Sequence, residues 1–451
     1  MSLNLKTAFS RSPGLWLMAS AICFVMMYLY WPNASFVEAE DSTTFFGDML
    51  DGTAGVHPNH LLFEPIYLWV MTAVGGASPL LVVQSLTALF ALLGLLGVYR
   101  LIAPRKGWLQ ALLATWLVAT TFGYWHYGKV VDAYVPALAC AIWALVVFDR
   151  LKTGAGPGRI ILMALILSAA VLFHQLYIVL AFMICVGLLF DADRGLRNAL
   201  LFTGVGVVVV GGAYVLAYLS LDPSLQDRGL LNWTLGRAEA GLWSPPDGST
   251  PIKATMGIAR VFVHISAFFG LEPIVDAASR TIGTERLIEE IYLAQTAISA
   301  PLTFLLPVMV GLYGLALVIL IPGGVPALVR TRLDRVDWLL VAAILVYTGL
   351  VLVWEASNNE FWIHIVAIVF ILFAATLSLS KIRIGLAFVA IVCAAVVNFS
   401  AGILPLSDPR HDYWAHMRAN IIKNVPEGSL ILADCAWLCR KYLRMCNHRN
   451  Y

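Results

Sequence analysis

The feature that most constrains this chain is a set of long apolar runs. The clearest run extends from Ile160 to Phe190 and contains no Lys, Arg, Asp or Glu. A helix needs about 20 apolar residues to cross the hydrocarbon layer of a bilayer. Across the 451 residues, 60% are hydrophobic and 12% are charged, whereas soluble domains carry about 25% charged residues. The sequence therefore excludes a soluble enzyme and predicts an all-α polytopic membrane protein.

Hydropathy predicts eleven transmembrane helices. They cover residues 14–31, 80–99, 108–123, 133–148, 160–173, 174–190, 199–219, 296–320, 338–354, 362–380 and 384–403. The first segment is long for a signal-peptide core, so we expect it to be retained as an anchor. The net charge of +2 provides no one-signed field for holding a nucleic acid, and we expect no nucleic-acid partner.

The basic residues predict the orientation of these spans. We place the N-terminus in the cytoplasm and let residues 60–75 lie in the membrane interface without crossing. The short inner segments then hold Lys6, Arg11, Arg100, Arg105, Lys106, Arg150, Lys152, Arg159, Arg194, Arg197, Arg330, Arg332, Arg335, Lys381 and Arg383. Lys129 is the only basic residue left in a short outer loop. Because Lys and Arg favour the cytoplasmic side, the opposite topology, in which 60–75 crosses, is disfavoured.

This topology divides the chain into a transmembrane domain, residues 1–403, and a short external tail, residues 404–451. Within the domain we predict a first external loop at 32–79 with interfacial helices, and a long external loop at 220–292. No Lys or Arg falls within the spans. Because transporters typically place charged groups at mid-membrane depth, this argues against a transporter. The working surface is therefore expected on the outer face of the plasma (inner) membrane. The tail cysteines Cys435, Cys439 and Cys446 allow one disulfide, whose pairing the sequence leaves open.

The first external loop is acidic and contains two predicted surface helices. Asp41 or Ser42 would cap the first helix, whose Phe45, Phe46, Met49 and Leu50 recur at helical spacing and are expected to rest on the lipid surface. His57 and His60 introduce the second helix. A lipid-linked sugar donor carries its phosphate and sugar at this depth. Transfer of that sugar to a hydroxyl needs one base and positive charge near the departing phosphate.

The first loop resembles that of the GT-C superfamily of integral-membrane glycosyltransferases. The resemblance rests on EDSTTFFGDMLDG, followed by HPNHLLFEPIYLWV and a span ending in arginine, and on YWHYGKVVDAYVPAL and LSAAVLFHQLY. It covers most of the chain as layout, and the PMT-like and DUF2723-like subgroup is the most similar. The resemblance implies that Asp41 is the catalytic base and that the donor is a polyprenyl-phosphate sugar. Glu38-Ala-Glu40-Asp41 lacks the paired D-x-D pattern, which leaves a divalent metal open.

Further candidates for substrate binding each have a structural alternative. Lys129 would pair with the donor phosphate or extend to lipid headgroups. Asp132 would orient Lys129, help hold a metal, or cap the span that begins at Ala133. His57 and His60 would contact phosphate or sugar, or simply end a loop. The other candidates are Glu40, Arg237 beside the tryptophans of the long loop, and Glu355 and Asn358 in a polar turn that is otherwise a solvated hairpin.

The sequence thus predicts an inverting glycosyltransferase with Asp41 as general base. The acceptor is a hydroxyl of a glycan, a lipid or a protein, and the membrane lipid is the second partner. Two alternatives stay open at this point: a flippase or transporter of lipid-linked oligosaccharides, and a transferase similar to O-antigen ligases that would depend on arginines and a histidine of the long loop.

Overall fold

The chain folds into helices, as the sequence predicts. The computed structural model describes residues 13–30, 40–50, 52, 55–75, 78–153, 156–190, 194–227, 229–235, 243, 245–264, 277, 280, 291–293, 302–321, 333–376, 380–424 and 426. These residues form no strand. The tail cysteines and Arg237 lie outside the described residues, as does the side chain of Glu40.

The first half of the chain supplies the helices of the first loop and the centre of the bundle. They are α2 (Pro13–Val25), α3 (Glu40–Leu50), α4 (Phe63–Val74), α5 (Pro79–Lys106), α6 (Trp108–Ala119), α7 (Phe122–Tyr127), α8 (Tyr134–Arg150), α9 (Pro157–Phe173), α10 (Ile178–Leu189), α11 (Gly195–Gly206) and α12 (Gly212–Leu219). A π-helical turn joins α11 to α12 and makes them one continuous helix.

The second half supplies the surrounding helices. They are α13 (Pro223–Gln226), α14 (Leu230–Leu235), α15 (Thr250–Phe262), α18 (Leu302–Leu320), α20 (Arg335–Trp354), α21 (Glu360–Thr376), α22 (Lys381–Asn398), α23 (Leu404–Leu406) and α24 (Tyr413–Asn424). Each of the eleven predicted spans overlaps at least one of these helices. Four helices in the described residues are long and apolar enough to cross a membrane, namely Pro79–Lys106, Gly195–Leu219, Arg335–Trp354 and Lys381–Leu406. Eleven as the number of spans stays a prediction.

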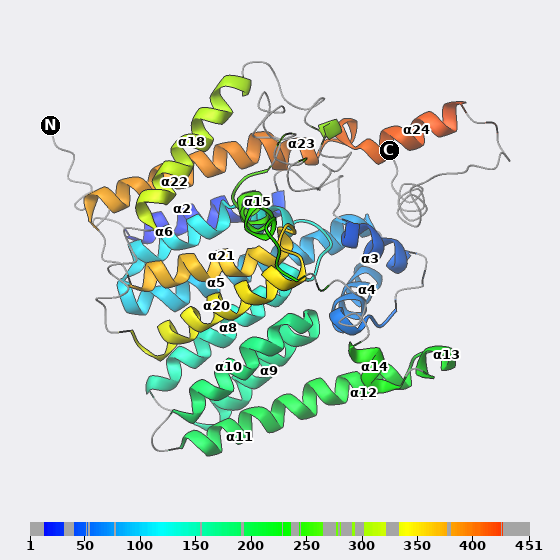
Figure 1. The fold of residues 1–451 in the computed structure, drawn as a ribbon, viewed down its shortest axis with the longest axis vertical. Coiled ribbons are helices and arrows are strands. Elements are labelled where there is room, and N and C mark those ends of the chain that lie inside the picture. Colours follow the sequence, from blue (N-terminus) through cyan, green and yellow to red (C-terminus); the bar gives the residue numbers. More distant parts are fainter. Residues whose placement is uncertain are drawn as a thin grey trace.

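The centre of the bundle is a close contact between α5 and α8. A methyl group at Gly97 of α5 would lie 2.8 Å from the Ile142 side chain of α8, and one at Gly94 would collide with the Tyr124 hydroxyl. Small residues of this kind let two membrane helices approach closely, which strengthens dispersion contacts. On its other side α8 packs against α9, and α18 packs against α22 at the edge of the bundle (Figure 1).

The long helices run side by side and give the molecule two opposite ends (Figure 1). We name them the Arg105 end and the α3 end. At the Arg105 end, Asp334 lies within 2.6 Å of Arg105 and 2.7 Å of Lys152. At the α3 end, the Tyr127 hydroxyl donates to Glu360 Oε1 over 2.9 Å. Loops that the sequence places on one side of the membrane therefore lie at one end of the bundle.

Helix α4 does not run between the two ends. Its last residue, Val74, is only a few residues before Pro79, where α5 starts at the α3 end. Just before α4, the Leu62 N–H donates to the Leu172 carbonyl in the last turn of α9, which is also at the α3 end. Both termini of α4 thus lie at the same end of the bundle. This position agrees with the predicted interfacial segment at 60–75.

The apolar face of α3 differs from the expectation. Phe45, Phe46 and Met49 are 5%, 2% and 2% exposed, and they pack into the protein core. The ring of Phe45 lies 5.2 Å from the ring of Phe63 in α4. These side chains therefore do not rest on lipid. Their hydrophobic burial against α4 holds α3 at the end of the bundle instead, by the same force that was expected to hold it on the membrane.

Candidate active site

A cavity of about 450 Å³ opens at the α3 end of the bundle. Its polar lining residues include Asp41, His60, His174, Glu355, Asn358 and Glu360. Its apolar lining residues include Ile178, Val179, Leu350, Val351, Trp354 and Phe361. The apolar residues come from the first turns of α10 and α21 and the last turns of α20. The cavity therefore has a mixed polar and apolar lining at the end of the helices.

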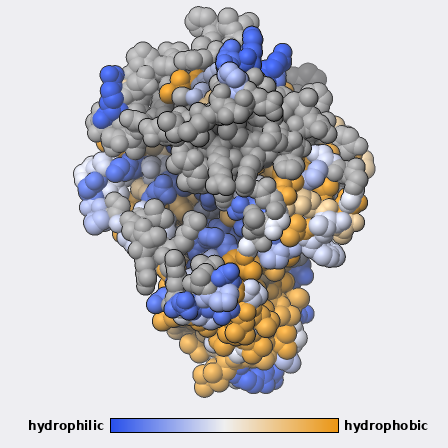
Figure 2. All heavy atoms as spheres, turned by 90° about the vertical axis from the view of Figure 1, so that its right-hand side faces the viewer, coloured by the Kyte–Doolittle hydropathy of each residue, from blue (hydrophilic) through white to orange (hydrophobic). Residues whose placement is uncertain are grey.

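Figure 2 looks at this end of the molecule. Hydrophilic residues face the viewer near the centre, and the lower part, where α11 and α12 lie in Figure 1, is mostly hydrophobic. Leu200, Val208 and Leu216 of this helix are 64%, 73% and 71% exposed. An exposed apolar surface of this kind is suited to lipid.

Asp41 reaches the cavity because α3 begins at Glu40. It is the second residue of the helix, so its carboxylate is close to the N-terminal end of α3. The structure thus places the predicted base at a cavity, beside polar side chains from other helices.

Two further carboxylates lie near Asp41. Asp132, which is 1% exposed, precedes α8, and Glu360 begins α21. Burial raises the pKa of Asp132 well above its usual value, and the Glu360 and Asp41 carboxylates raise it further. Among the described residues, the ion pairs include none of these three acids. Uncompensated acids in one place are typical of functional sites, because their repulsion and desolvation cost stability.

Asp132 is held by the backbone on one side. Its Oδ1 accepts the N–H of Tyr134, the first residue of α8, over 3.1 Å. Its Oδ2 is buried without a hydrogen-bond partner in the described part of the chain. Asp132 does not line the cavity itself. Its contact with the start of α8 agrees with the capping alternative, and its proposed roles near Lys129 or a metal stay predictions.

Lys129 is buried, which corrects one of the two expectations for it. The residue is 4% exposed, so its ammonium group does not extend to lipid headgroups. Burial lowers the pKa of Lys129 to about 8. It is not among the residues that line the cavity, and neither is His57. Contact of either residue with a phosphate therefore stays a prediction.

Imidazole rings from two turns meet beside the cavity. His60 ends a 3₁₀ turn, Pro58–His60, and His174 begins a second one, Gln175–Tyr177. Their ring centroids are 4.8 Å apart, and both rings line the cavity.

Several of these residues carried a weak signal in the sequence. Glu360 belongs to the same polar turn as Glu355 and Asn358, for which the sequence predicts contact with sugar or acceptor. His174 belongs to the segment LSAAVLFHQLY and had no predicted role of its own. Tyr127 had no signal. Its hydroxyl meets Glu360 across 233 positions of sequence, and a contact at such a separation leaves no periodic pattern to find.

A metal ion has no obvious set of ligands here. Among the described residues, no three His, Cys, Asp or Glu side chains form a group that would hold one. Asp132 and Glu360 supply carboxylates, but Tyr127 and the start of α8 engage both of them. The described side chains form no complete ligand set, so we assign no step to a metal.

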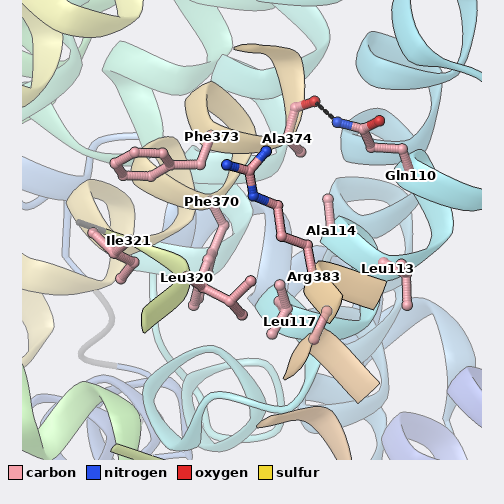
Figure 3. A pocket seen from close by; sticks show the side chains of 11 residues that line it. Gln110, Leu113, Ala114, Leu117, Leu320, Ile321, Phe370, Phe373, Ala374 and Arg383 are labelled. Atoms are coloured by element: carbon pink, nitrogen blue, oxygen red, sulfur yellow. Dashed lines mark hydrogen bonds between the residues drawn. The ribbon is translucent and has the colours of Figure 1, made fainter. Parts of the chain in front are cut away.

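The Arg105 end contains a different kind of cavity. It has a volume of about 70 Å³ and lies between α6, α18, α21 and α22. Figure 3 shows mainly apolar side chains around it, with Arg383 and Gln110 as the charged and polar members. Gln110 donates to the Ala374 carbonyl over 2.5 Å. Its size and lining give it no catalytic group.

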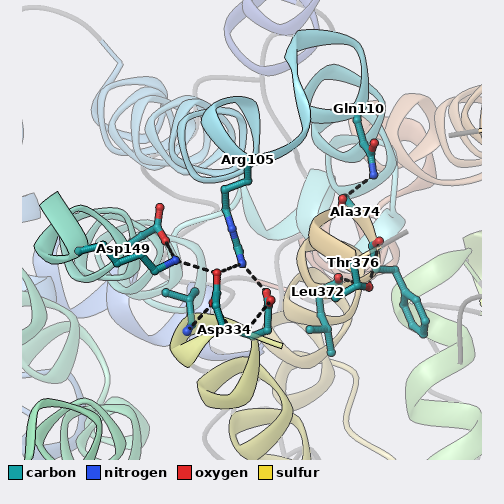
Figure 4. A network of polar contacts seen from close by, with 11 residues as sticks. Arg105, Gln110, Asp149, Asp334, Leu372, Ala374 and Thr376 are labelled. Carbon is teal, nitrogen blue, oxygen red and sulfur yellow. Dashed lines mark hydrogen bonds and ion pairs between the residues drawn. The ribbon is translucent and has the colours of Figure 1, made fainter. Parts of the chain in front are cut away.

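Carboxylates at the Arg105 end are paired (Figure 4). Arg105 donates to Asp334 over 2.6 Å and to Asp337 over 2.7 Å, and Lys152 donates to Asp149 over 2.6 Å and to Asp334 over 2.7 Å. Asp334 also caps α20 through the N–H groups of Val336 and Asp337. This ion-pair network joins α5, α8 and α20.

The bundle carries α3 and α4 at the end where the acid-lined cavity opens. Solved structures of an archaeal oligosaccharyltransferase and of ArnT have a similar fold, which confirms the GT-C-like helical fold that the sequence predicts. No family model and no curated protein sequence matches the chain. The sequence identities are 13–15%, so the likeness concerns the fold.

One similar structure is ArnT from Cupriavidus metallidurans bound to undecaprenyl phosphate. It has a TM-score of 0.56 and 13% identity, and the match covers 96% of this chain and 85% of that one. A second is the archaeal oligosaccharyltransferase AglB from Archaeoglobus fulgidus with an inhibitory peptide and a dolichol-phosphate, with a TM-score of 0.52 and 15% identity over 98% of this chain and 64% of that one.

The oligosaccharyltransferase of Archaeoglobus fulgidus has also been solved in complex with Zn and sulfate. That structure has a TM-score of 0.52 and 15% identity, and the match covers 96% of this chain. This chain spans 61–64% of the length of the archaeal protein.

Proposed function

We propose that this protein is an inverting glycosyltransferase that moves a sugar from a polyprenyl-phosphate donor to an acceptor hydroxyl on the extracytoplasmic side of the membrane. The observation that carries the proposal is the cavity at the α3 end, where Asp41 lines a space together with both polar and apolar side chains. A donor of this class has the same two parts, because a charged sugar phosphate is attached to an apolar chain.

The apolar part of the lining suits the polyprenyl chain. Ile178 of α10 is 56% exposed, and it lines the cavity together with Leu350 and Val351 of α20. A chain that lies along these residues stays in an apolar environment while its phosphate remains at the end of the bundle. Support also comes from the comparison structures, which hold undecaprenyl phosphate and dolichol-phosphate.

Asp41 acts as the general base in this proposal. It accepts the proton of the acceptor hydroxyl while the hydroxyl oxygen attacks the anomeric carbon of the donor sugar. The bond between that carbon and the phosphate oxygen breaks, and polyprenyl phosphate leaves with the electron pair. Attack from the face opposite the phosphate inverts the anomeric configuration. Lys129 offers the leaving phosphate a positive charge if a substrate-induced shift brings the two together.

The acceptor is a hydroxyl of a glycan, a lipid or a protein. An acceptor that enters from the aqueous side meets Glu355 and Asn358, which lie at the polar part of the cavity; Glu355 is exposed. The archaeal oligosaccharyltransferase has been solved in complex with Zn, and a divalent metal is therefore compatible with the proposed function. The described side chains offer no ligand set for it, so the proposed reaction runs without a metal-dependent step.

Substitution of Asp41 tests the proposal. The purified full-length chain, in lipid nanodiscs, is incubated with undecaprenyl-phosphate monosaccharides and simple alcohols as acceptors, and released undecaprenyl phosphate is measured by mass spectrometry. We expect Asp41→Asn to lower the release rate at least about 100-fold, the effect of losing a general base, with an unchanged melting temperature. Asp48→Asn, in the same helix but away from the cavity lining, is the matched control and keeps its rate.

Equal rates for the wild type and Asp41→Asn would refute Asp41 as the base. If the wild type releases no undecaprenyl phosphate from any of these sugars, the proposed donor class is wrong.

A further inference from the structure

Two 3₁₀ turns, Pro58–His60 and Gln175–Tyr177, contribute to the cavity lining at the α3 end. They come from distant parts of the chain, and no single helix contains both of them. The lining residues in these turns or next to them are Asn59, His60, His174, Gln175 and Leu176. The shape of the cavity therefore depends on how the two turns are held relative to each other.

The hydroxyl of Tyr214 connects the two turns. Tyr214 belongs to α12 and is 8% exposed. Its hydroxyl donates to the Pro58 carbonyl over 2.5 Å and accepts an N–H of the Gln175 side chain over 2.7 Å. The same amide nitrogen also donates to the Thr234 carbonyl of α14 over 3.2 Å. Four segments of the chain therefore meet at one hydroxyl and one amide.

The chemistry of the partners fixes the direction of each of these hydrogen bonds. The carbonyl oxygens of Pro58 and Thr234 can only accept. The Tyr214 hydroxyl therefore gives its single hydrogen to Pro58 and offers a lone pair to Gln175. The amide of Gln175 presents its nitrogen, with two hydrogens, to Tyr214 and Thr234. The side chain of Gln175 is thus held in one orientation.

Apolar packing supports the same connection. Tyr214 forms a small buried cluster, separate from the main core, with Leu61, Leu172 and Trp233. Leu61 directly follows the first turn, and Leu172 lies two residues before His174. The ring centroids of Tyr214 and Trp233 are 6.1 Å apart. Both the polar and the apolar contacts behind the two turns therefore converge on Tyr214.

The second turn lies where the cavity lining changes from polar to apolar. His174 and Gln175 are polar, whereas Ile178 and Val179, in the first turn of α10, are apolar. A lipid-linked donor changes in the same way at the bond between its phosphate and its chain. A displacement of about 1 Å at an active site can lower a rate about 100-fold. The position of this turn is therefore important for how a donor lies along the cavity.

We propose that Tyr214 is a positioning residue, which holds the turns Pro58–His60 and Gln175–Tyr177 in the arrangement that places the donor's sugar phosphate beside Asp41. This inference rests on the proposed function and deepens it. Tyr214 is not among the residues that line the cavity, so it acts through Pro58 and Gln175.

Two tyrosines of α12 provide a test with a matched control. Tyr214→Phe removes only the hydroxyl and keeps the ring beside Trp233. Tyr218 lies one turn further along, its ring centroid is 6.0 Å from that of Trp233, and its hydroxyl also donates to a backbone carbonyl, that of Gln226. Gln226 belongs to α13 and to neither turn. Tyr214→Phe and Tyr218→Phe thus lose the same group and differ in what that group holds.

The first measurement needs no substrate. Hydrogen–deuterium exchange is followed in the full-length chain in lipid nanodiscs. The N–H groups of His60 and Tyr177 donate to nearby carbonyls over 3.0 and 3.1 Å and report on the two turns. We expect both to exchange roughly 3- to 10-fold faster in Tyr214→Phe, the effect of one hydrogen bond. In Tyr218→Phe they exchange at the wild-type rate.

The second measurement is the release of undecaprenyl phosphate from undecaprenyl-phosphate monosaccharides, with a simple alcohol as acceptor. We expect Tyr214→Phe to lower kcat at least about 10-fold, whereas Tyr218→Phe keeps the wild-type kcat. Gln175→Leu breaks the same connection from the other side. Because both substitutions interrupt one network, we expect the double variant Tyr214→Phe/Gln175→Leu to be no slower than Gln175→Leu.

Three outcomes would overturn the inference. The first is wild-type exchange or a wild-type kcat in Tyr214→Phe. The second is an equal loss in Tyr218→Phe, which would indicate a general effect on α12. The third is a double variant in which the two losses of kcat multiply. A wild type that releases no undecaprenyl phosphate, in a chain where Tyr214→Phe still alters exchange in both turns, would instead contradict the proposed function and the placement of the donor with it.

Discussion

The two ends of this molecule use carboxylates in opposite ways. At the Arg105 end, Asp334 and Asp337 contact Arg105 at 2.6 and 2.7 Å. At the α3 end, Asp41, Asp132 and Glu360 interact repulsively and take part in none of the ion pairs among the described residues. Paired acids hold helices together. Acids that repel one another reduce stability, so their grouping at this end, two of them in the cavity lining, is typical of a functional site.

The largest expected difference between the ends is in stability. Arg105→Met leaves Asp337, whose side chain is 6% exposed, without its cation. Removing one partner of a buried pair costs about 3 kcal/mol. We expect a loss of that size in the free energy of unfolding, measured by SDS titration in mixed micelles, while the remaining folded protein keeps its transfer rate. A lower rate with unchanged stability would contradict a purely structural role.

The next effect is a pH dependence at the α3 end. The pKa of Lys129 is about 8 because of burial, so the ammonium group loses its proton between pH 7 and 9. If Lys129 binds the donor phosphate, affinity for undecaprenyl phosphate falls by up to about tenfold over this range. The Lys129→Met variant binds weakly with no such slope. A flat profile for the wild type would remove Lys129 from phosphate binding.

Unfolding does not account for that loss of affinity. The pKa of Lys129 in the folded chain lies below the usual value of 10.5. The folded state therefore disfavours the charged form, and deprotonation between about pH 8 and 10.5 makes the fold more stable. We therefore expect the melting temperature to stay constant or to rise over the same pH range as Lys129 loses its proton.

Asp132→Asn is expected to change the free energy of unfolding less than Arg105→Met does, and in the opposite direction. Asparagine keeps an oxygen that accepts the Tyr134 N–H and removes a charge whose burial is unfavourable. We expect Asp132→Asn to leave the free energy of unfolding unchanged or to raise it by up to about 1 kcal/mol, with a lower transfer rate. A loss of stability similar to that of Arg105→Met would erase the distinction between the two ends.

The smallest effect is expected at the edge of the ion-pair network. The side chains of Lys152 and Asp334 are 36% and 35% exposed, and pairs this exposed contribute about 0.5 kcal/mol. Lys152→Met is therefore expected to lower the free energy of unfolding by about that amount. Because solvent ions screen such pairs, the difference from the wild type should disappear in high salt. A loss as large as that of Arg105→Met would show that the network acts as one unit.

Much of the fold was predictable because membrane helices follow from local sequence. Each of the eleven predicted spans overlaps a helix, and α4 stays at one end of the bundle, which agrees with the distribution of arginines. The place of Asp41 at the start of α3 was equally local, since it depends on the helix signal around Ser42. The burial of Phe45 and Phe46 was not predicted, because an apolar helix face looks the same whether it packs on lipid or on protein.

The sequence by itself determined which segments are apolar helices, which loops share a side and where the first acids fall. The tertiary structure alone decided that Asp132 and Glu360 join Asp41, that Lys129 is buried and that His60 meets His174. The physical reason is the distance along the chain over which each effect acts. Hydropathy and capping act over a few neighbouring residues, whereas the cavity is made by helix ends that come together only when α5, α8, α9 and α21 pack side by side.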